Sequence, residues 1–169
     1  MEEQGTPRTS RIVVGVDGSA ESVLALKWGQ KMAQSLNTRI IAVTAWHMET
    51  VFGSYIIPDW DPDQDAQQLL KDAAQEAFGD GMPEGFTGVC VRGRPAKVLI
   101  DAAESAHMLI VGSRGRGGFK GMLLGSVSSA CVEHAPCPVL VVPLSLDTVP
   151  GPETVGANNE DTDEPVSTS

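Results

Sequence analysis

Short apolar runs alternate along the chain with longer segments in which apolar residues recur every three or four positions. The runs at residues 11–16, 39–46, 87–92, 108–111 and 139–142 are rich in β-branched residues and are typical of strands. Several of them are apolar without interruption, which fits burial on both faces of a sheet. Strands that alternate with helices predict an α/β fold, an open five-stranded parallel sheet with helices on both faces.

Local signals mark the beginnings and ends of the intervening helices. Ser19 is a suitable cap before the first helix, and Asn37 is a suitable left-handed stop after it. Asp61 followed by Pro62 marks the start of the second helix, because Asp is a suitable cap and proline is favoured at the first helical position. The predicted helices span residues 20–36, 62–78, 95–106 and 126–133.

The charge of the chain is concentrated at its end. The formal net charge is -10, and residues 144–169 hold six of the acidic residues and no Lys or Arg. With so little apolar surface, we expect residues 1–10 and 145–169 to be disordered, the latter as an acidic tail, with one folded domain at residues 11–144. The acidic balance argues against nucleic acid as a partner, because phosphate backbones attract clustered Lys and Arg.

Other classes of protein are disfavoured by what the sequence contains. No apolar run approaches the roughly 20 residues of a membrane span, and the first residues show no signal region, so we expect no membrane partner and a cytoplasmic protein. The three cysteines, Cys90, Cys131 and Cys137, lack paired spacing and are interpreted as reduced thiols. The three histidines share no ligand spacing, so no metal site within the protein is expected.

Two segments follow strands at the edge where open parallel sheets bind ligands, residues 15–19 and residues 111–129. The second is rich in glycine, carries Arg114, Arg116 and Lys120, and leads into a helix whose first turn holds Ser126 and Ser128. Flexible N–H groups, positive charge and a helix start together favour a polyphosphate. A loop of this kind can also serve only as a connection between elements, and the glycine count alone leaves both interpretations open.

Two common nucleotide motifs are absent from these segments. A Walker A loop requires Lys after its last glycine, whereas Lys120 precedes Gly121. A dinucleotide fingerprint requires three spaced glycines directly after the first strand, and the sequence GVDGS does not supply them. A P-loop NTPase and an NAD-dependent dehydrogenase are therefore disfavoured.

The second segment resembles that of a known family. Gly112-Ser113-Arg114-Gly115, nine further residues, and then Gly125-Ser126 is similar to the G-x2-G-x9-G-[ST] spacing of ATP-binding universal stress proteins. GVDGS, TAW, GRPAKVLIDAAE and CPVLVVP also resemble that family, in the same order along the chain. The resemblance covers residues 11–143, nearly the whole predicted domain.

The resemblance implies a fold, a ligand and a set of contacts. The strand order would be 3-2-1-4-5, the ligand ATP with Mg²⁺ on its phosphates, and the assembly a homodimer through the fifth strand, Val139–Val142. Asp17 would contact the ribose, Ala45 the adenine, and Gly125 with Ser126 the phosphates. The implied nucleotide-binding residues are Gly15, Val16, Asp17, Ala45, Val111, Gly112, Ser113, Arg114, Gly115, Arg116, Gly125, Ser126, Val127 and Ser128.

Three functions remain open at this point. The first is an ATP-binding regulatory protein of the stress response, which acts through nucleotide-dependent conformation or partner binding. The second is a slow ATPase, or an enzyme that phosphorylates itself on Ser126 or Ser128, although no general base or other catalytic residue stands out near the loop. The third is a nucleotide-free dimerisation module. For the first two, Gly112→Ala or Gly125→Ala is expected to abolish ATP binding and leave the fold intact.

One segment has no assigned role. The loop 47–60 is more apolar than a solvated loop, with Phe52, Tyr55 and Trp60 among its residues. It could cover the nucleotide pocket, pack on a partner subunit, or lie on the domain.

Overall fold

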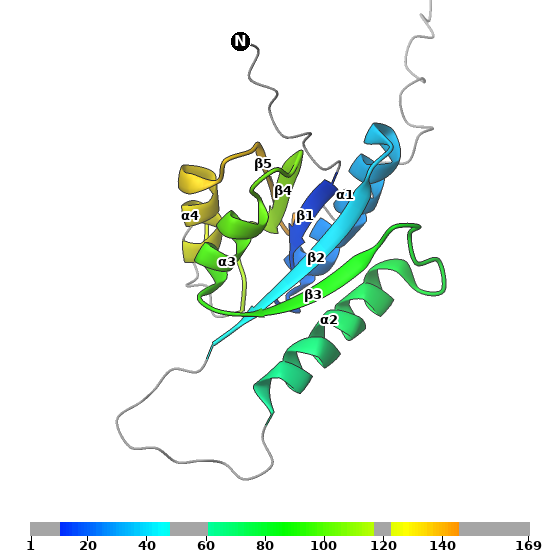
Figure 1. Cartoon of the computed structure of the whole chain (residues 1–169), viewed down its shortest axis with the longest axis horizontal. Coiled ribbons are helices and arrows are strands. Elements are labelled where there is room, and N and C mark those ends of the chain that lie inside the picture. The colour runs from blue at the N-terminus through cyan, green and yellow to red at the C-terminus, as the bar shows by residue number, and fades with distance from the viewer. Residues whose placement is uncertain (1–10, 48–60, 117–122, 146–169) are drawn as a thin grey trace, which may run out of the picture.

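The computed structural model describes residues 11–47, 61–116 and 123–145 of the chain. Within these residues one parallel sheet has the strand order β3-β2-β1-β4-β5, and Figure 1 shows helices on both of its faces. The strands are β1 (Arg11–Gly15), β2 (Arg39–Trp46), β3 (Thr87–Arg92), β4 (Met108–Gly112) and β5 (Val139–Val142). The helices are α1 (Ala20–Leu36), α2 (Pro62–Phe78), α3 (Pro95–Ala102) and α4 (Ser126–His134). The predicted fold class and strand order are confirmed.

Strand β1 lies at the centre of the sheet and pairs with β2 on one side and β4 on the other. Val14 is the register partner of Ala42 in β2 and of Ile110 in β4. The chain builds outward from β1 to β3 and then returns to the other side of β1 to form β4 and β5. The carboxyl ends of β1 and β4 therefore flank the point where the direction of winding reverses, which is where open α/β sheets bind ligands.

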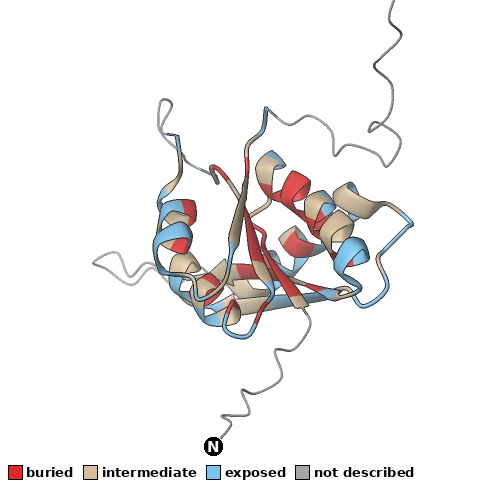
Figure 2. Ribbon diagram, turned by 90° about the horizontal axis from the view of Figure 1, so that it is seen from above, coloured by how far each residue is buried: buried red, intermediate tan, exposed pale blue. Residues whose placement is uncertain are grey.

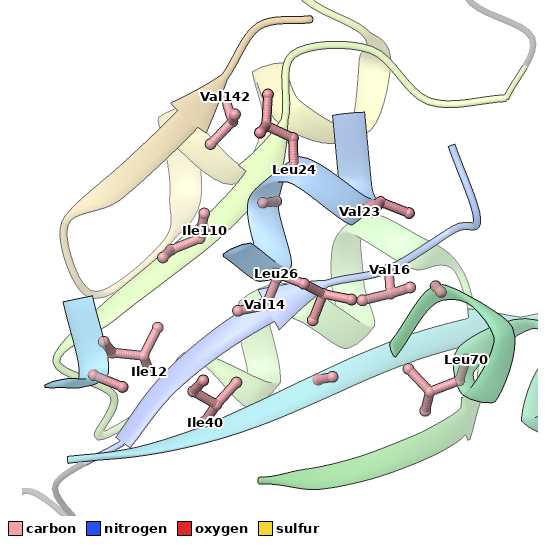
Figure 3. Packing of buried hydrophobic residues seen from close by; sticks show 14 residues of the cluster. Ile12, Val14, Val16, Val23, Leu24, Leu26, Ile40, Leu70, Ile110 and Val142 are labelled. Atoms are coloured by element: carbon pink, nitrogen blue, oxygen red, sulfur yellow. The ribbon is translucent and has the colours of Figure 1, made fainter. Parts of the chain in front are cut away.

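The face of the sheet that α1 and α2 cover holds the larger part of the core. Ile12, Val14 and Ile110 point to this face from neighbouring strands and pack with Leu26 of α1 and Leu70 of α2, as Figure 3 shows. The strand side chains are fully buried, with exposed fractions of 0%. Burial of such side chains on folding is the main source of stability for a domain without disulfides.

The opposite face is covered by α3 and α4. Because successive strand residues point to opposite sides, Val13 and Leu109 lie on this face and pack with Leu99 of α3 and Cys131 of α4. Buried residues follow the centre of the sheet on both sides in Figure 2, and the exposed ones gather on the outer surfaces of the helices. The uninterrupted apolar strands are thus explained by burial on two faces.

The predicted helix signals act as expected at α1 and α2. The Ser19 side chain accepts a hydrogen bond from the Ser22 N–H, and Asn37 adopts the left-handed conformation at φ 48° after α1. The Asp61 side chain accepts from the N–H groups of Asp63 and Gln64 at the start of α2. Each of these contacts satisfies backbone groups that a helix end leaves without a partner.

Helix α3 is shorter than the apolar pattern predicted. It ends at Ala102 rather than Ala106, and a tight turn with Ser105 at φ 64° leads into β4. Ala103 and Ala106 are nevertheless buried, with exposed fractions of 0% and 1%. Because the turn itself packs into the core, its apolar residues prolong the helical pattern beyond the end of the helix.

Several predictions fall outside the described residues. They are the disorder of residues 1–10 and 145–169 apart from Ser145, the apolar loop beyond His47, and the contribution of Gly117, Gly118, Lys120 and Gly121 to the glycine-rich segment. Among the helices that are described, none is both long enough and apolar enough to cross a membrane.

Candidate functional site

A pocket of about 550 Å³ lies at the carboxyl ends of β1 and β4. It brings together the two segments that the sequence singled out, although they lie far apart along the chain. The lining residues are Gly15, Val16, Asp17, Ser19, Ser22, Val43, Ala45, Pro95, Leu99, Val111, Gly112, Arg114, Gly115, Arg116, Gly125, Ser126, Val127 and Ser128. All the site residues predicted from the sequence line this pocket except Ser113, and their contacts with a ligand stay predictions.

Ser113 has a structural position behind the pocket. Its side chain is buried, its backbone N–H donates to the Val142 carbonyl at 2.8 Å, and its carbonyl accepts from the Gly125 N–H at 2.8 Å. The residue therefore joins β5 to the start of α4. It holds the pocket wall together, and it is not among the residues that line the pocket.

One end of the pocket is apolar. Val43 and Ala45 line it from β2, Val111 from β4, and Pro95 with Leu99 from α3. A Cβ at position 15 would lie 2.9 Å from a terminal methyl group of Leu99, so the glycine there lets the leucine approach the β1 backbone. Apolar walls around a slot between a sheet and a helix suit a flat ring such as a nucleobase.

Sequence reasoning missed part of this apolar end. Val43 lies two residues before Ala45 on β2, and the period of a strand places both on the same face, so this residue could have been found from the pattern. Pro95 and Leu99 reach the pocket only because α3 packs across β1 and β2, and no local signal in the sequence indicates that arrangement. Ser19 was interpreted only as a helix cap, and Ser22 was not singled out.

The carboxylate of Asp17 connects the two segments. Its Oδ1 accepts hydrogen bonds from the backbone N–H of Ser19 at 3.0 Å and from the Ser19 hydroxyl. Its Oδ2 accepts from the backbone N–H of Arg116 at 3.0 Å, across 99 positions of sequence. A carboxylate that accepts backbone N–H groups makes stronger bonds than a neutral acceptor would, so Asp17 ties the glycine-rich segment to the start of α1.

Residues 112–116, here called the first loop half, are crowded by the protein itself. A Cβ at position 112 would lie 2.6 Å from the Glu21 Cβ and 3.2 Å from the Glu21 carbonyl carbon, on α1. A Cβ at position 115 would clash with the Asp17 Oδ2. Packing therefore requires glycine at position 112 whether or not a ligand is present, and a side chain at position 115 would have to displace the Asp17 carboxylate from its hydrogen bonds. The expectation that Gly112→Ala leaves the fold intact is corrected for this reason.

Residues 125–128, here called the second loop half, form the opening of α4. Gly125 is the N-cap, with no side-chain cap, and the first intrahelical bond runs from the Ser129 N–H to the Gly125 carbonyl at 2.9 Å. The N–H groups of Ser126, Val127 and Ser128 precede that bond and face the pocket end of the helix. Such groups, with the positive end of the helix dipole, suit an anion.

The two serines of the second loop half have different surroundings. The Ser128 side chain is buried, and its hydroxyl lies 2.9 Å from the Ser113 carbonyl oxygen and 3.0 Å from that of Gly125. Ser126 is exposed at the pocket. The hydroxyl of Ser126 is thus available to a ligand, whereas that of Ser128 fastens α4 to the end of β4.

Gly125 is not crowded by the protein. A Cβ there would have its nearest neighbours at 3.6 Å, the Arg114 Cα and the Ser113 carbonyl oxygen, which is ordinary van der Waals contact. Its φ of -74° is open to any residue. The packing of the described residues therefore gives no reason for glycine at this position.

Charge in the pocket is unevenly distributed. Arg114 and Arg116 are the two cations among the described lining residues, and Asp17 is the one carboxylate. The Arg114 Cα lies 3.6 Å from where a Cβ on Gly125 would be, beside the opening of α4, whereas a terminal nitrogen of Arg116 lies 3.1 Å from the same point on Gly18. Positive side chains and helix N–H groups at one place favour a phosphate group there.

Helix α4 packs into the core through the side chain of Cys131. Cys131 is fully buried, and burial, followed by the charge of Cys137, raises the pKa of its thiol from 9.0 to about 11. Burial, followed by the charge of Asp63, also raises the pKa of Cys90. Raised pKa values favour the neutral form of both thiols at neutral pH.

Residues 9–143 match the model of the universal stress protein family. The chain belongs to this family. The universal stress protein Rv2623 of Mycobacterium tuberculosis is 37% identical over 144 residues, which cover 83% of this chain and 47% of that protein. This universal stress protein thus spans about half the length of the curated relatives it matches.

Solved structures of universal stress proteins share the fold. UspA from Lactobacillus plantarum aligns with a TM-score of 0.62 at 22% identity, over 81% of this chain and 99% of that one. A universal stress protein in complex with cAMP aligns with a TM-score of 0.61 at 26% identity, over 79% of this chain and 96% of that one.

Proposed function

We propose that this universal stress protein binds ATP in the pocket between β1 and β4 and acts as a regulatory protein whose conformation or partner contacts depend on nucleotide occupancy. The observation that carries the proposal is one pocket that combines apolar residues of β2, β4 and α3 with two arginines and the opening of α4. An adenine ring suits the slot, and a phosphate chain suits the helix opening with Arg114 and Arg116. A relative with 26% identity was solved with cAMP, which supports an adenine nucleotide as the ligand class.

ATP would then lie in this pocket in one direction. Adenine would lie between Val43, Ala45 and Leu99, the ribose near Asp17, and the phosphates along Gly115 and the first turn of α4. Mg²⁺ would be held by phosphate oxygens and water, since the one carboxylate among the described lining residues already accepts several protein N–H and O–H groups. The hydroxyl of Ser126 is the protein group best placed to assist.

The chemistry of the lining favours binding over fast turnover. Its described residues include no His, Lys or Glu, and Asp17 is engaged by Ser19 and Arg116. A general base must be free to take a proton from an attacking water, and the one acceptor position that Asp17 retains is the position proposed for the ribose. Occupancy would then change the protein through differential affinity between two states.

The direct experiment is to denature the purified full-length chain and identify any released nucleotide by chromatography and mass. ATP in near-equal amount to protein supports regulation by occupancy, and ADP alone supports turnover. A preparation without nucleotide is then tested by thermal unfolding with Mg-ATP, Mg-GTP and cAMP, because a ligand at one hundred times its Kd stabilises by about 2.7 kcal/mol. A melting temperature that no adenine nucleotide raises contradicts the proposal and leaves the nucleotide-free dimerisation module.

We also propose that two copies of the chain associate along β5. Val139, Leu140 and Val141 are only half-buried on this edge strand, and Val132 and Leu144 beside it are 53% and 46% exposed. An unpaired edge of this kind tends to be covered.

The mass measured by light scattering tests this association. A dimer is expected for the parent and a weaker dimer for Leu144→Lys. Met82→Lys is the control, because Met82 is equally exposed but follows α2, which packs on the β3 side of the sheet. A monomeric parent contradicts the proposal.

A further inference from the structure

The carboxylate of Asp17 is in use before any ligand arrives. Three donors reach it among the described residues: the Ser19 N–H and Ser19 hydroxyl on Oδ1, and the Arg116 N–H on Oδ2. A carboxylate offers about four acceptor positions. Both positions of Oδ1 are thus occupied, and Oδ2 keeps one for a ligand.

The bond to Arg116 is a positioning contact for the first loop half. The loop backbone lies so close to Asp17 that any side chain at position 115 would collide with Oδ2. The Arg116 guanidinium folds back in the same direction, since one of its terminal nitrogens lies 3.1 Å from where a Cβ on Gly18 would be. Residues 115 and 116 are therefore held against the chain segment that follows β1.

A sugar with two adjacent hydroxyl groups would normally place both on one carboxylate. Here the second hydroxyl would have to displace a donor that already has good geometry. Displacing Arg116 would release the first loop half, and displacing Ser19 would disturb the cap of α1, which the same hydroxyl provides by accepting from the Ser22 N–H at 3.2 Å. Either exchange gains one hydrogen bond and loses another, so it adds little affinity.

We propose that Asp17 positions the first loop half through Arg116 and has room for only one sugar hydroxyl of a bound nucleotide. This inference rests on the proposed nucleotide binding. Its consequence is a specificity: the site accepts 2′-deoxy and 3′-deoxy adenine nucleotides nearly as well as ribonucleotides, and loses affinity only when both hydroxyls are absent.

The positioning role is tested without nucleotide. The amide exchange rate of Arg116 is measured by NMR in the parent and in Asp17→Asn, which has nearly the same shape but a single oxygen that cannot serve both Ser19 and Arg116. Exchange in Asp17→Asn is expected to be roughly tenfold faster, as the loss of a hydrogen bond to a charged acceptor implies. Asp101→Asn is the control, because it removes an equal charge from the exposed pair with Lys97. Equal exchange rates in the parent and Asp17→Asn overturn the positioning role.

The specificity is tested by calorimetry with Mg-ATP, 2′-dATP, 3′-dATP and 2′,3′-dideoxy-ATP. In the parent, each single deoxy nucleotide is expected to bind within about threefold of ATP, and the dideoxy nucleotide roughly tenfold more weakly. Separate tenfold losses for the 2′ and 3′ hydroxyls would mean that both are bound, which overturns the single acceptor position. Equal binding of all four nucleotides would overturn it as well, because no hydroxyl would then be recognised.

The variants separate the two roles of Asp17. Asp17→Ala is expected to weaken all four nucleotides, the dideoxy one included, because the loop loses its position, and to remove the differences among them. If Asp17→Ala binds the dideoxy nucleotide as the parent does, Asp17 contacts sugar only and the positioning role is wrong. A parent that binds none of the four contradicts the proposed function and the hydroxyl specificity together, whereas the exchange rates still decide the positioning role by themselves.

Discussion

The first loop half, residues 112–116, is packed against α1 and Asp17, whereas the second, residues 125–128, opens into the pocket at the start of α4. Gly112 and Gly115 have no space for a Cβ, because Glu21 and Asp17 occupy it. Gly125 has ordinary contact distances around the same position. One spacing motif thus contains glycines that the fold requires and a glycine for which the described protein atoms give no requirement.

The difference shows that a conspicuous glycine is weak evidence about a ligand until its surroundings are known. A Cβ at position 125 would project among Ser113, Arg114 and Ser128, next to the helix N–H groups that we propose bind phosphate. Glycine there is explained if a ligand approaches the backbone closely. The two halves should consequently respond to the same substitution in different ways.

The largest effect on stability is expected for Gly112→Ala. Its new methyl group would press on the backbone of α1 at Glu21, and overpacking of this kind costs about 1–3 kcal/mol. The urea concentration at the midpoint of unfolding should fall while the slope of the transition stays the same. An unchanged midpoint would mean that α1 shifts enough to accommodate the methyl group without loss of stability. The contrast between the two loop halves would then disappear.

Gly125→Ala is expected to weaken ATP binding roughly tenfold or more, about 1.4 kcal/mol, and to leave the free energy of unfolding nearly unchanged. Calorimetry and urea unfolding of the same preparation measure the two effects. Gly81→Ala is the matched control, since Gly81 also lies in a loop with only an ordinary contact, at 3.4 Å, and is far from the pocket lining. Retained affinity in Gly125→Ala would remove the second loop half from the site.

The serines sharpen the comparison within the second loop half. Ser128→Ala removes a buried hydroxyl that holds the Ser113 carbonyl, and the loss of such a hydrogen bond costs about 0.5–1.5 kcal/mol. Ser126→Ala removes an exposed hydroxyl and should change ATP affinity but not the unfolding midpoint. The opposite result, with Ser126 supporting the fold and Ser128 the ligand, would reverse the assignment of the two residues.

The last effect concerns Cys131 of α4 and is absent at neutral pH, because it appears only in alkali. The pKa of Cys131 is raised from 9.0 to about 11 in the folded protein, so its neutral thiol contributes stability that is fully present below pH 9 and is lost as the pH rises toward 11. The parent should therefore lose more stability between pH 9 and pH 11 than Cys131→Ala, as measured by urea unfolding across that range. Parallel curves for the two proteins would show that the thiol does not ionise with unfolding.

Much of the fold was predictable because local signals and the global pattern agree. Ser19, Asn37 and Asp61 end or begin helices as their chemistry indicates, and the strands are buried on both faces. The strand order came from resemblance to a family rather than from the pattern. The predicted end of α3, at Ala106, was wrong because a buried turn at Ala103 and Ala106 carries the same apolar spacing as a helix.

The site was predictable as far as it follows from strand ends and from the glycine spacing. The structure gathers Asp17, Ala45, Arg114 and Ser126 around one pocket, as the sequence suggested. The reasons for individual residues were not predictable, because they depend on contacts between distant segments. Nothing near position 112 indicates that Glu21 of α1 fills the space beside it, or that Leu99 of α3 closes the apolar slot.

The contact between Asp17 and position 115 also restricts how the protein can change over generations. A side chain gained at position 115 while the aspartate stays would push the Asp17 carboxylate out of its place and away from its donors on Ser19 and Arg116. If the aspartate is lost first, the segment near Arg116 loses its acceptor before any compensating group is present. The two positions are thus genetically interdependent.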